Sequence, residues 1–503
     1  MNLLGIDVGT TGCKVALFSL HGEMLASAYR EYDPQSPQAG WAELDAAAIW
    51  ESVKAAIRSV TAANPKAEIK ALSVSSLGEA VVAVSEDRQI LGPSLLNFDI
   101  RGEEFLDGLS ALIPNERLYA INGNTLGNHY SLTKLKWIQT HQPELYARAY
   151  KFLHWSNFIA FMLGADPSVD FSLANRTLLF DIHQGNWSGT LLKEFNIDRS
   201  KLPVTVPSGT VIGTVATHIA ANLGLPPGVL IVSGAHDQCA NAVGCGVVDS
   251  GDAVYGMGTY HCITPVFATQ LNPQMMIARG LNTEHHAIPD RFVCFIYNQG
   301  GSLVKWFRDT FATVEHHQAE AEGRSVYPAL FAEVSPEPSK VMVLPHFSPT
   351  GPPKFIADSA GLIAGLHVGT KRGEVLKGII EGAAFYLKEL VDSLPATGIQ
   401  IENYRAVGGG SRSDAWVQTC ADIFGQPFTR PVITEAGALG AAIIAGVGSG
   451  GFENYTQGVE FMVKLERTFE PNLLLHERYQ TRYQYYQRLL PLMGDYLREL
   501  SKE

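Results

Sequence analysis

The sequence predicts an α/β protein in which helices alternate with the strands of a mixed or parallel sheet. Residues 3–18 (LLGIDVGTTGCKVALF) are two short apolar runs joined by a tight polar turn, which predicts a pair of strands. A helix follows over 44–62, with Asp45 as its N-cap, and two further strands are expected at 69–75 and 80–84. This alternation is typical of sheets covered by helices.

The second half of the chain repeats the plan of the first half without repeating its sequence. Residues 252–264 (DAVYGMGTYHCIT) again give a strand, a glycine turn and a strand. We therefore expect a domain boundary at 247–252, with domains over 1–246 and 247–503. At roughly 150 residues per domain, the length permits two to four units.

Composition points to a globular protein with a small ligand. Of the 503 residues, 46% are hydrophobic, and the net charge of -12 argues against a broad nucleic-acid or anionic-membrane surface. The six cysteines form no CxxC pair, the acidic residue Asp7 precedes any signal-peptide core, and no apolar run reaches 18 residues. We expect a reduced, cytoplasmic protein with no nucleic-acid or membrane partner. The sequence leaves the oligomeric state open, a homodimer included.

The turn of the opening strand pair has the composition of a phosphate and metal site. Gly9 and Gly12 are expected to turn the backbone with positive φ, so that amide groups converge on an anion. Thr10, Thr11 and Lys14 add hydroxyl groups and a cation, and Asp7 suits a hydrated divalent cation. The alternative is a hairpin whose glycines serve only the turn. It is not a GxxxxGK[ST] loop.

Asp237 lies where a strand (228–233 and its continuation) gives way to a small apolar helix over 239–245. Ligands of open α/β sheets gather at the carboxyl ends of strands, so a catalytic residue is expected there. The alternative is that Asp237 only caps the helix. We also expect a strand at 205–213 and an amphipathic helix over 134–148.

A glycine turn follows a second strand end, at Gly408, Gly409, Gly410 and Ser411, between a strand at 404–407 and a helix at 414–424. Such a turn lets the backbone approach a flat ligand or a phosphate. By itself it is also a common turn. Near the middle of the first half, Asp99 and Arg101 look like an exposed acid and base.

Together these segments resemble the FGGY carbohydrate kinase family of the actin, Hsp70 and hexokinase superfamily, over about residues 3–450. Five segments carry the resemblance, in order along the chain: DVGTTGCK (7–14), KLKWI (134–138), DFSLANRTLLFD (170–181), GLIAGL (361–366) with Glu374 and Glu381, and GGGSRS with EAGALGAA (408–442).

The resemblance implies two ribonuclease-H-like (actin-like ATPase) domains that close on ATP and a sugar or polyol in the cleft between them. It places Asp237 at the catalytic base and Asp7 beside Mg²⁺. The nucleotide side is implied to comprise Gly9, Thr10, Thr11, Lys14, Gly258, Thr259, Gly408, Gly409, Gly410 and Ser411. The substrate side is implied to comprise Glu79, Asp99, Arg101, Asp237 and Gln238.

The sequence departs from the family pattern at several positions. Met257 stands where many relatives have a threonine in the second phosphate loop, although Thr259 is a candidate to replace it. Asn97 replaces the tryptophan of the W-x-D-x-R substrate motif, and Leu77-Gly78-Glu79 replaces the Met-His-Gly of typical xylulokinases. Glu79 and Gln238 are closer to the glycerol kinase pattern, without its preceding arginine.

Three function classes follow. The first is a sugar or polyol kinase, with a pentulose such as xylulose as the first candidate and glycerol, erythritol or another polyol as the alternative. The second is a nucleotide switch of the same superfamily, which needs no base for an acceptor hydroxyl. The third is a catalytically impaired sugar-binding relative, which Met257 favours.

The histidines are expected to be structural. His236 and Asp237 are neighbours at a strand end, where adjacent side chains point apart, so a His-Asp pair is not expected. The pairs His285-His286 and His316-His317 lack Cys, Asp or Glu at ligand spacing, so they are expected on the surface and not around a metal.

Overall fold

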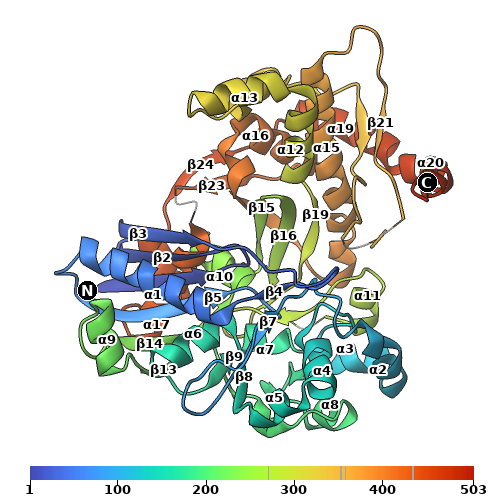
Figure 1. Ribbon diagram of the computed structural model, residues 1–503. Helices are drawn as coiled ribbons and strands as arrows, with labels where there is room; N and C mark the ends of the chain where they lie inside the picture. The colour runs from blue at the N-terminus through green and yellow to red at the C-terminus, as the bar shows by residue number, and fades with distance from the viewer. Residues whose placement is uncertain (270, 352–353, 357, 433–434, 503) are drawn as a thin grey trace.

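The computed structural model describes residues 1–269, 271–351, 354–356, 358–432 and 435–502. Two sheets, each with its own helices, make up the molecule: the first sheet lies in the lower part of Figure 1, and the second sheet lies above it with α12, α15 and α16. Both ends of the chain lie at the periphery. Among the described helices, none is long and apolar enough to cross a membrane.

The first sheet has six strands in the order β13-β14-β5-β1-β2-β3. Its three central strands β14, β5 and β1 are parallel, and the flanking pairs are antiparallel. The strands are β1 (Asn2–Val8), β2 (Gly12–Ser19), β3 (Met24–Glu31), β5 (Ile69–Ser76), β13 (Val211–Thr214) and β14 (Leu230–His236).

The second sheet repeats this arrangement in the order β19-β16-β15-β22-β23-β24, with the same parallel and antiparallel neighbours. It also extends from β16 to β18 and β17. The predicted repeat of plan is therefore confirmed. The strands are β15 (Gly251–Met257), β16 (Tyr260–Phe267), β17 (Glu284–His285), β18 (Phe292–Val293), β19 (Ile296–Gln299), β22 (Ile401–Val407), β23 (Phe428–Pro431) and β24 (Leu465–Phe469).

Short strand pairs support the segments inserted between these sheet strands. They are β4 (Glu43–Leu44) with β7 (Ser94–Leu95), β6 (Val81–Val84) with β8 (Lys151–His154), β9 (Ser168–Asp170) with β12 (Val204–Val206), β10 (Phe180–Asp181) with β11 (Asn186–Trp187), and β20 (Met342–Leu344) with β21 (Leu362–Ala364).

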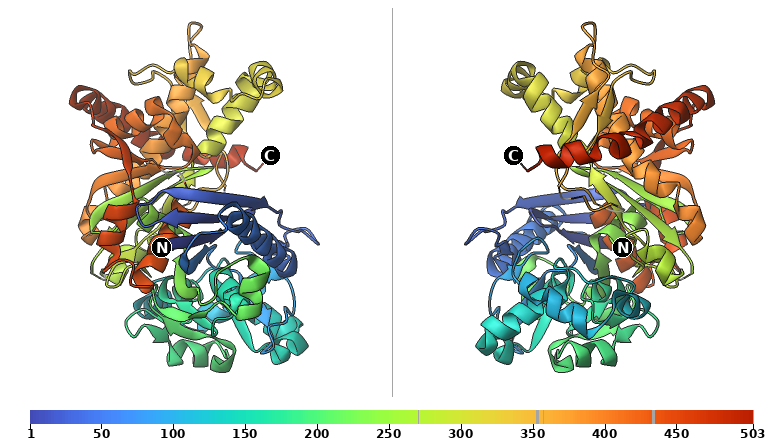
Figure 2. Two further views of the ribbon diagram at one scale, coloured as in Figure 1. Left: turned by 90° about the vertical axis from the view of Figure 1, so that its left-hand side faces the viewer. Right: turned by 90° about the vertical axis from the view of Figure 1, so that its right-hand side faces the viewer.

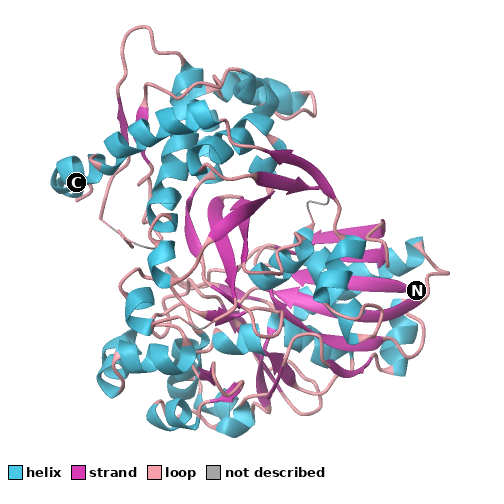
Figure 3. Ribbon diagram, turned by 180° about the vertical axis from the view of Figure 1, so that it is seen from behind, coloured by secondary structure: helices cyan, strands magenta, loops and turns pink. Residues whose placement is uncertain are grey.

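Helices cover the sheets on the outside and also fill the layer between them (Figures 2 and 3). In the first half they are α1 (Ala46–Ala63), α2 (Leu106–Leu112), α3 (Asn115–Asn122), α4 (Ser131–His141), α5 (Pro143–Arg148), α6 (Trp155–Leu163), α7 (Phe171–Asn175), α8 (Gly189–Glu194), α9 (Thr217–Leu223) and α10 (Asp237–Gly244). In the second half they are α11 (Pro273–Ile277), α12 (Gly301–Phe311), α13 (Thr313–Ala321), α14 (Tyr327–Ala332), α15 (Arg372–Val391), α16 (Asp414–Phe424), α17 (Ala436–Gly448), α18 (Tyr455–Met462), α19 (Leu473–Gln487) and α20 (Leu489–Leu500).

The alternation of apolar residues along β1 explains the layers. Leu4, Ile6 and Val8 pack with α1 and α6 in one buried cluster, whereas Leu3 belongs to a cluster with α10 and α17 on the opposite face. This second cluster also contains Val254 of β15, so α10 and α17 lie between the two sheets.

Small residues let α17 lie directly on the first sheet, although it belongs to the second half of the chain (Figure 1). A Cβ atom at Gly5 would lie 1.8 Å from the carbonyl oxygen of Ala438, and one at Gly440 would lie 1.9 Å from that of Ala240. The small residues after Glu435 thus allow α17 to pack closely. This packing brings the start of α17 to the carboxyl end of β1.

Most predicted elements are present, and two differ. Asp45 caps α1 as expected, by accepting hydrogen bonds from the N–H groups of Ala47 and Ala48. The predicted helix over 134–148 is two helices, α4 and α5, because Pro143 begins a new one. The predicted strand over 205–213 is likewise two strands, β12 and β13, which pair with different partners.

Candidate functional site

The parallel strands β1, β5 and β14 bring two carboxylates to one edge of the first sheet. In the register of these strands, Asp7 lies beside Ser75, which lies beside Ala235, two residues before Asp237. Ser75 Oγ donates a hydrogen bond of 2.6 Å to Asp7 Oδ1. The expected position of Asp237 at the carboxyl end of a strand is therefore confirmed.

Asp237 is the first residue of α10 and does not cap it. The N-cap is His236, and no side-chain capping bond is formed there, so the helix-capping interpretation of Asp237 is wrong. Burial, followed by the nearby Asp7 carboxylate, raises the pKa of Asp237 to about 7, although hydrogen bonds from Gln238 and the charge of Arg176 lower it in part. Burial also raises the pKa of Asp7. The two carboxylates therefore share one electrostatic environment.

His236 and Asp237 approach each other, contrary to the expectation that they point apart. His236 Nε2 lies 3.2 Å from Asp237 Oδ1. The alternation of side chains applies only within a strand, and here the chain turns from β14 into α10 between the two residues. Burial and the nearby Arg176 hold the pKa of His236 well below its usual range, so the imidazole is neutral.

The turn between β1 and β2 exposes backbone donors. Two of its carbonyl groups are occupied: the Gly9 carbonyl accepts a hydrogen bond of 2.8 Å from the Tyr32 hydroxyl, and the Thr11 carbonyl accepts one of 3.1 Å from the N–H of Tyr32. Within the described chain, the N–H groups of Thr10 and Thr11 have no hydrogen-bond partner. N–H groups left in this way can bind an anion.

The expected backbone conformation of the two glycines is wrong, because neither Gly9 nor Gly12 has a positive φ. Gly12 instead leaves room for the Tyr29 ring, since a Cβ atom there would lie 2.3 Å from the Tyr29 hydroxyl. Lys14, in register with Asp7, forms an ion pair of 2.5 Å with Glu435 at the start of α17. A Cβ atom at Gly437 would lie 2.5 Å from Asp7 Oδ2, so α17 begins directly against the Asp7 carboxylate.

The second turn, between β15 and β16, has the same design. The carbonyls of Gly258 and Thr259 accept hydrogen bonds from the N–H groups of Gly301 and Gly300, at 2.9 and 3.2 Å. Their own N–H groups have no partner in the described chain. Glycine followed by threonine therefore occupies this turn just as Gly9 and Thr10 occupy the first.

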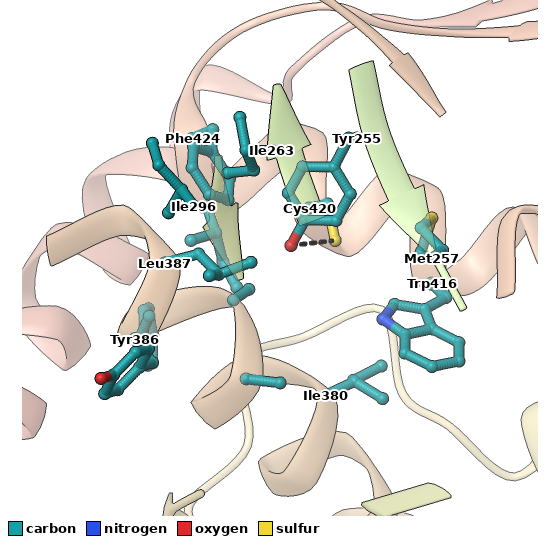
Figure 4. Packing of buried hydrophobic residues seen from close by; sticks show 14 of the residues in the cluster. Tyr255, Met257, Ile263, Ile296, Ile380, Tyr386, Leu387, Trp416, Cys420 and Phe424 are labelled. Carbon is teal, nitrogen blue, oxygen red and sulfur yellow. Dashed lines mark hydrogen bonds between the residues drawn. The ribbon is translucent and has the colours of Figure 1, made fainter. Parts of the chain in front are cut away.

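Met257 is the last residue of β15, a position that corresponds to Val8 in β1. Its side chain is 1% exposed and points into the core of the second half beside Trp416 (Figure 4). A hydroxyl at position 257 would thus face the core. Thr259, by contrast, lies in the turn itself, and the effect of Met257 on activity stays a prediction.

The triple-glycine turn lies against the second phosphate turn. Gly408 has a φ of 88°, and a Cβ atom there would lie 3.1 Å from the Met257 carbonyl. A Cβ atom at Gly410 would likewise lie 3.0 Å from the Met257 carbonyl oxygen. Gly409 has open space around it, and Ser411 Oγ donates 2.7 Å to the carbonyl of Gly408. These glycines bring the backbone close to the protein itself, and the approach to a flat ligand or a phosphate stays a prediction.

On the substrate side, Glu79 is buried and forms an ion pair with Arg176. Arg176 also forms an ion pair with Glu284, which belongs to the second half. The sequence reasoning missed both partners. Arg176 lies within the stretch DFSLANRTLLFD, between Asn175 and Thr177, and is the one basic residue of that stretch, which is the signal that could have found it. No sequence pattern around Glu284 indicates that it belongs to the site.

Asp99 and Arg101 are buried, so the expectation that they are exposed is wrong. Asp99 accepts hydrogen bonds from the N–H of Ala42 and from Arg101, and Arg101 also pairs with Glu43 at 2.9 Å. The guanidinium lies 3.9 Å from the Trp41 ring centroid. Among the described residues, no hydrogen bond or ion pair joins this pair to Glu79 or Asp237. Its partners are structural, and a role in substrate binding stays a prediction.

The expectation of surface histidines fails for one pair. His286 is buried, and His285 is half-buried with Nε2 2.9 Å from the carbonyl oxygen of Ile182. His316 is half-buried and His317 is exposed. In the described ranges, no three His, Cys, Asp or Glu side chains are grouped to hold a metal ion.

Taken together, the edge of the first sheet offers Asp237, whose pKa is raised to about 7, a second carboxylate beside it and one turn with free N–H groups, and the second sheet offers another such turn. A base and an anion-binding backbone are the two components that phosphoryl transfer to a hydroxyl requires.

Comparison with known proteins agrees with this chemistry. The model of the N-terminal domain of the FGGY family of carbohydrate kinases matches residues 2–244, and the model of its C-terminal domain matches residues 277–449. A xylulose kinase of Escherichia coli (strain K12) is 27% identical over 98% of this chain and 100% of its own length. A glycerol kinase of Janthinobacterium sp. (strain Marseille) is 28% identical over 95% of this chain and 96% of its own. The crystal structure of a xylulose kinase from Rhodospirillum rubrum superimposes with a TM-score of 0.88 at 25% identity, over 99% of this chain and 100% of that one.

Proposed function

The chain belongs to the FGGY family of carbohydrate kinases, and on this premise we propose that it transfers the γ-phosphoryl group of ATP to a hydroxyl of a pentulose, with xylulose as the first candidate. The observation that carries the proposal is the Asp237 carboxylate at the end of β14, with a pKa of about 7. A general base works best when its pKa lies near the working pH. The relatedness to xylulose kinases over nearly the whole chain supports the choice of acceptor.

In the proposed mechanism, Asp237 accepts the proton of the acceptor hydroxyl as that oxygen bonds to the γ-phosphorus of ATP, while the bond from this phosphorus to the bridging oxygen breaks and ADP leaves. The neutral His236 donates its Nε2–H toward Asp237 Oδ1, 3.2 Å away, which leaves Oδ2 to receive the proton. His236 Nδ1 has no partner in the described chain, which is consistent with this tautomer. The histidine thereby orients the base.

The glycine turns of both halves also suit the phosphates of a nucleotide. The free N–H groups of Thr10, Thr11, Gly258 and Thr259 would contact phosphate oxygens, and Gly408 to Ser411 would form part of the nucleotide side. The oxygen donors of Asp7 suit Mg²⁺, a hard cation that proteins commonly hold through one or two carboxylates together with substrate phosphates. Bound there, Mg²⁺ would neutralise charge on the transferring phosphoryl group.

A polyol kinase is the second candidate. The relatedness to glycerol kinases at a similar level of identity favours it, as does the pair Glu79 and Gln238. A pure nucleotide switch has no acceptor hydroxyl to deprotonate, so it would not need a base such as Asp237, whose pKa is raised. The impaired-relative hypothesis loses its main argument because Met257 faces the core.

The test compares kcat/KM for xylulose, ribulose, glycerol and erythritol on the parent protein and on Glu79→Gln. We expect xylulose to be the best acceptor and the substitution to change the order of preference, because a site that hydrogen-bonds a hydroxyl discriminates strongly when that bond is altered. Glu337→Gln is the control, since the Glu337 side chain is exposed and its one ion pair among the described residues is with Arg478. If glycerol were the best acceptor, the pentulose assignment would be wrong.

A further inference from the structure

We infer that Arg176 is an acceptor-binding residue that, together with Glu79, selects neutral polyhydroxylated acceptors over acidic ones. The inference rests on the proposed function, because it concerns the acceptor of the same site. Arg176 follows α7 directly, as its C-cap residue, and is 8% exposed.

The Arg176 guanidinium is held on several sides. One terminal nitrogen pairs with Glu79 of the first half, and the other pairs with Glu284 of the second half. The guanidinium carbon also lies 5.1 Å from the ring centroid of Tyr130 and 5.7 Å from that of Phe295. Such a clamp fixes the plane of the guanidinium and therefore the direction of its remaining donor.

That remaining donor is free. Arg176 Nε is buried and has no hydrogen-bond partner in the described chain. It lies beside Gly78: a Cβ atom there would be 3.5 Å from Arg176 Nε and 3.0 Å from His236 Nε2. Because Gly78 has no side chain, Arg176 Nε stands next to the pair formed by His236 and Asp237.

A buried donor without a partner is costly, so Arg176 Nε calls for a partner that a bound molecule can supply. The Nε–H group can donate to an acceptor hydroxyl beside the one that Asp237 deprotonates. In the described hydrogen bonds the Glu79 carboxylate accepts only from Arg176, so it can also accept from a hydroxyl. A donor and an acceptor side by side match neighbouring hydroxyls of a sugar or polyol.

The charges of this cluster exclude acidic acceptors. Glu79 and Glu284 together outweigh the single positive charge of Arg176, and Asp237 adds a further acid nearby. An acceptor with a carboxylate, such as an aldonate, would meet net negative charge in a buried site. Like charges brought together in such a place are strongly disfavoured.

The test uses Arg176→Lys, which keeps the positive charge but removes the Nε–H donor and the planar fork. We expect KM for the best neutral acceptor to rise at least tenfold, in the range for a lost hydrogen bond to a charged group. We expect kcat to change by less than about threefold and KM for ATP to stay the same, because the base and the nucleotide turns are untouched. Arg372→Lys is the control, since Arg372 also bridges two carboxylates, Glu315 and Glu333, on the surface of the second half.

A second variant, Glu284→Gln, tests the charge argument without changing Arg176. For the parent we expect the inhibition constant of D-gluconate to exceed KM for the neutral acceptor by at least about a hundredfold. Because Glu284→Gln removes one negative charge, it should lower the ratio of the D-gluconate inhibition constant to the acceptor KM about tenfold.

The outcomes separate the inference from the proposed function. A parent protein that phosphorylates none of the neutral acceptors would overturn the proposed function. A parent that is active, with an unchanged acceptor KM in folded Arg176→Lys, would overturn the role of Arg176. If Arg176→Lys does not fold, as judged by its thermal unfolding, the decision passes to Glu284→Gln, and an unchanged gluconate ratio would then overturn the inference.

Discussion

Replacement of Asp237 by asparagine should abolish turnover while it stabilises the fold. The asparagine has nearly the same shape but cannot accept the proton of the acceptor hydroxyl. Loss of a general base typically lowers the rate by about 10²- to 10⁴-fold. Binding of the acceptor should persist, because Glu79 and Arg176 remain.

The stability effect follows from the pKa of Asp237, which rises from 3.8 to about 7 on folding. A raised pKa means that the carboxyl group favours the folded state only while it is protonated, below pH 3.8, and that this contribution is lost as the pH rises through about 7. A shift of about three pH units corresponds to about 4 kcal/mol at most. Because the side chain is 27% exposed, water reduces the penalty, and we expect about 1–2 kcal/mol.

The assay is thermal unfolding of the parent and of Asp237→Asn at pH 4 and pH 8, together with the rate at each pH from 5 to 9. At pH 8 the variant should unfold a few degrees higher, about 3 °C for each kcal/mol in a domain of this size. At pH 4 the two proteins should unfold at nearly the same temperature. The rate of the parent should fall tenfold per pH unit below about pH 7.

Asp495→Asn is the matched control, because the Asp495 side chain is 94% exposed. It should change neither the rate nor the unfolding temperature. If Asp237→Asn retained turnover within about threefold of the parent, Asp237 would not be the base. If its unfolding temperature were lower than that of the parent at pH 8, the raised pKa would be refuted as well.

Three further predictions concern the phosphate side and the two halves. Asp7→Ala should raise the Mg²⁺ concentration needed for half-maximal rate and leave acceptor KM nearly unchanged, and an unaltered Mg²⁺ titration would remove Asp7 from the metal site. Met257→Thr should not raise kcat. It should lower the free energy of unfolding by about 1–3 kcal/mol, because it places a hydroxyl and a void in the core. A tenfold gain in kcat would instead support the hypothesis of a catalytically impaired relative. Small-angle scattering should show a smaller radius of gyration with sugar and a non-hydrolysable nucleotide, since closure keeps water from competing as acceptor, and no change would count against a hinge at 247–252.

The fold could be predicted because its signals are local. The two strand pairs, the N-cap Asp45 and the glycine turn at 408–410 each depend on neighbouring residues, and each is present in the structure. The interruption at Pro143 is also local in origin. What the sequence did not reveal is how α17 crosses to the first sheet, which depends on small residues far apart in the chain.

The candidate site could be predicted only where its residues follow strands. Asp7 and Asp237 stand at strand ends, a position that indicates function by itself. Arg176 and Glu284 meet across a long sequence separation, so no pattern in either segment indicates the other. The expectation that Asp99 and Arg101 are exposed was wrong because it was based on their charge alone. Their mutual pairing allows both side chains to be buried.

The central claim is that the phosphoryl group leaves ATP for a hydroxyl of a neutral sugar. The most direct measurement is ³¹P NMR of the parent protein with Mg²⁺, ATP and xylulose. The account predicts one equivalent of ADP and one of a sugar phosphate monoester, with no signal above background when Asp237→Asn is used. Release of ADP with inorganic phosphate, unaffected by xylulose, would contradict it.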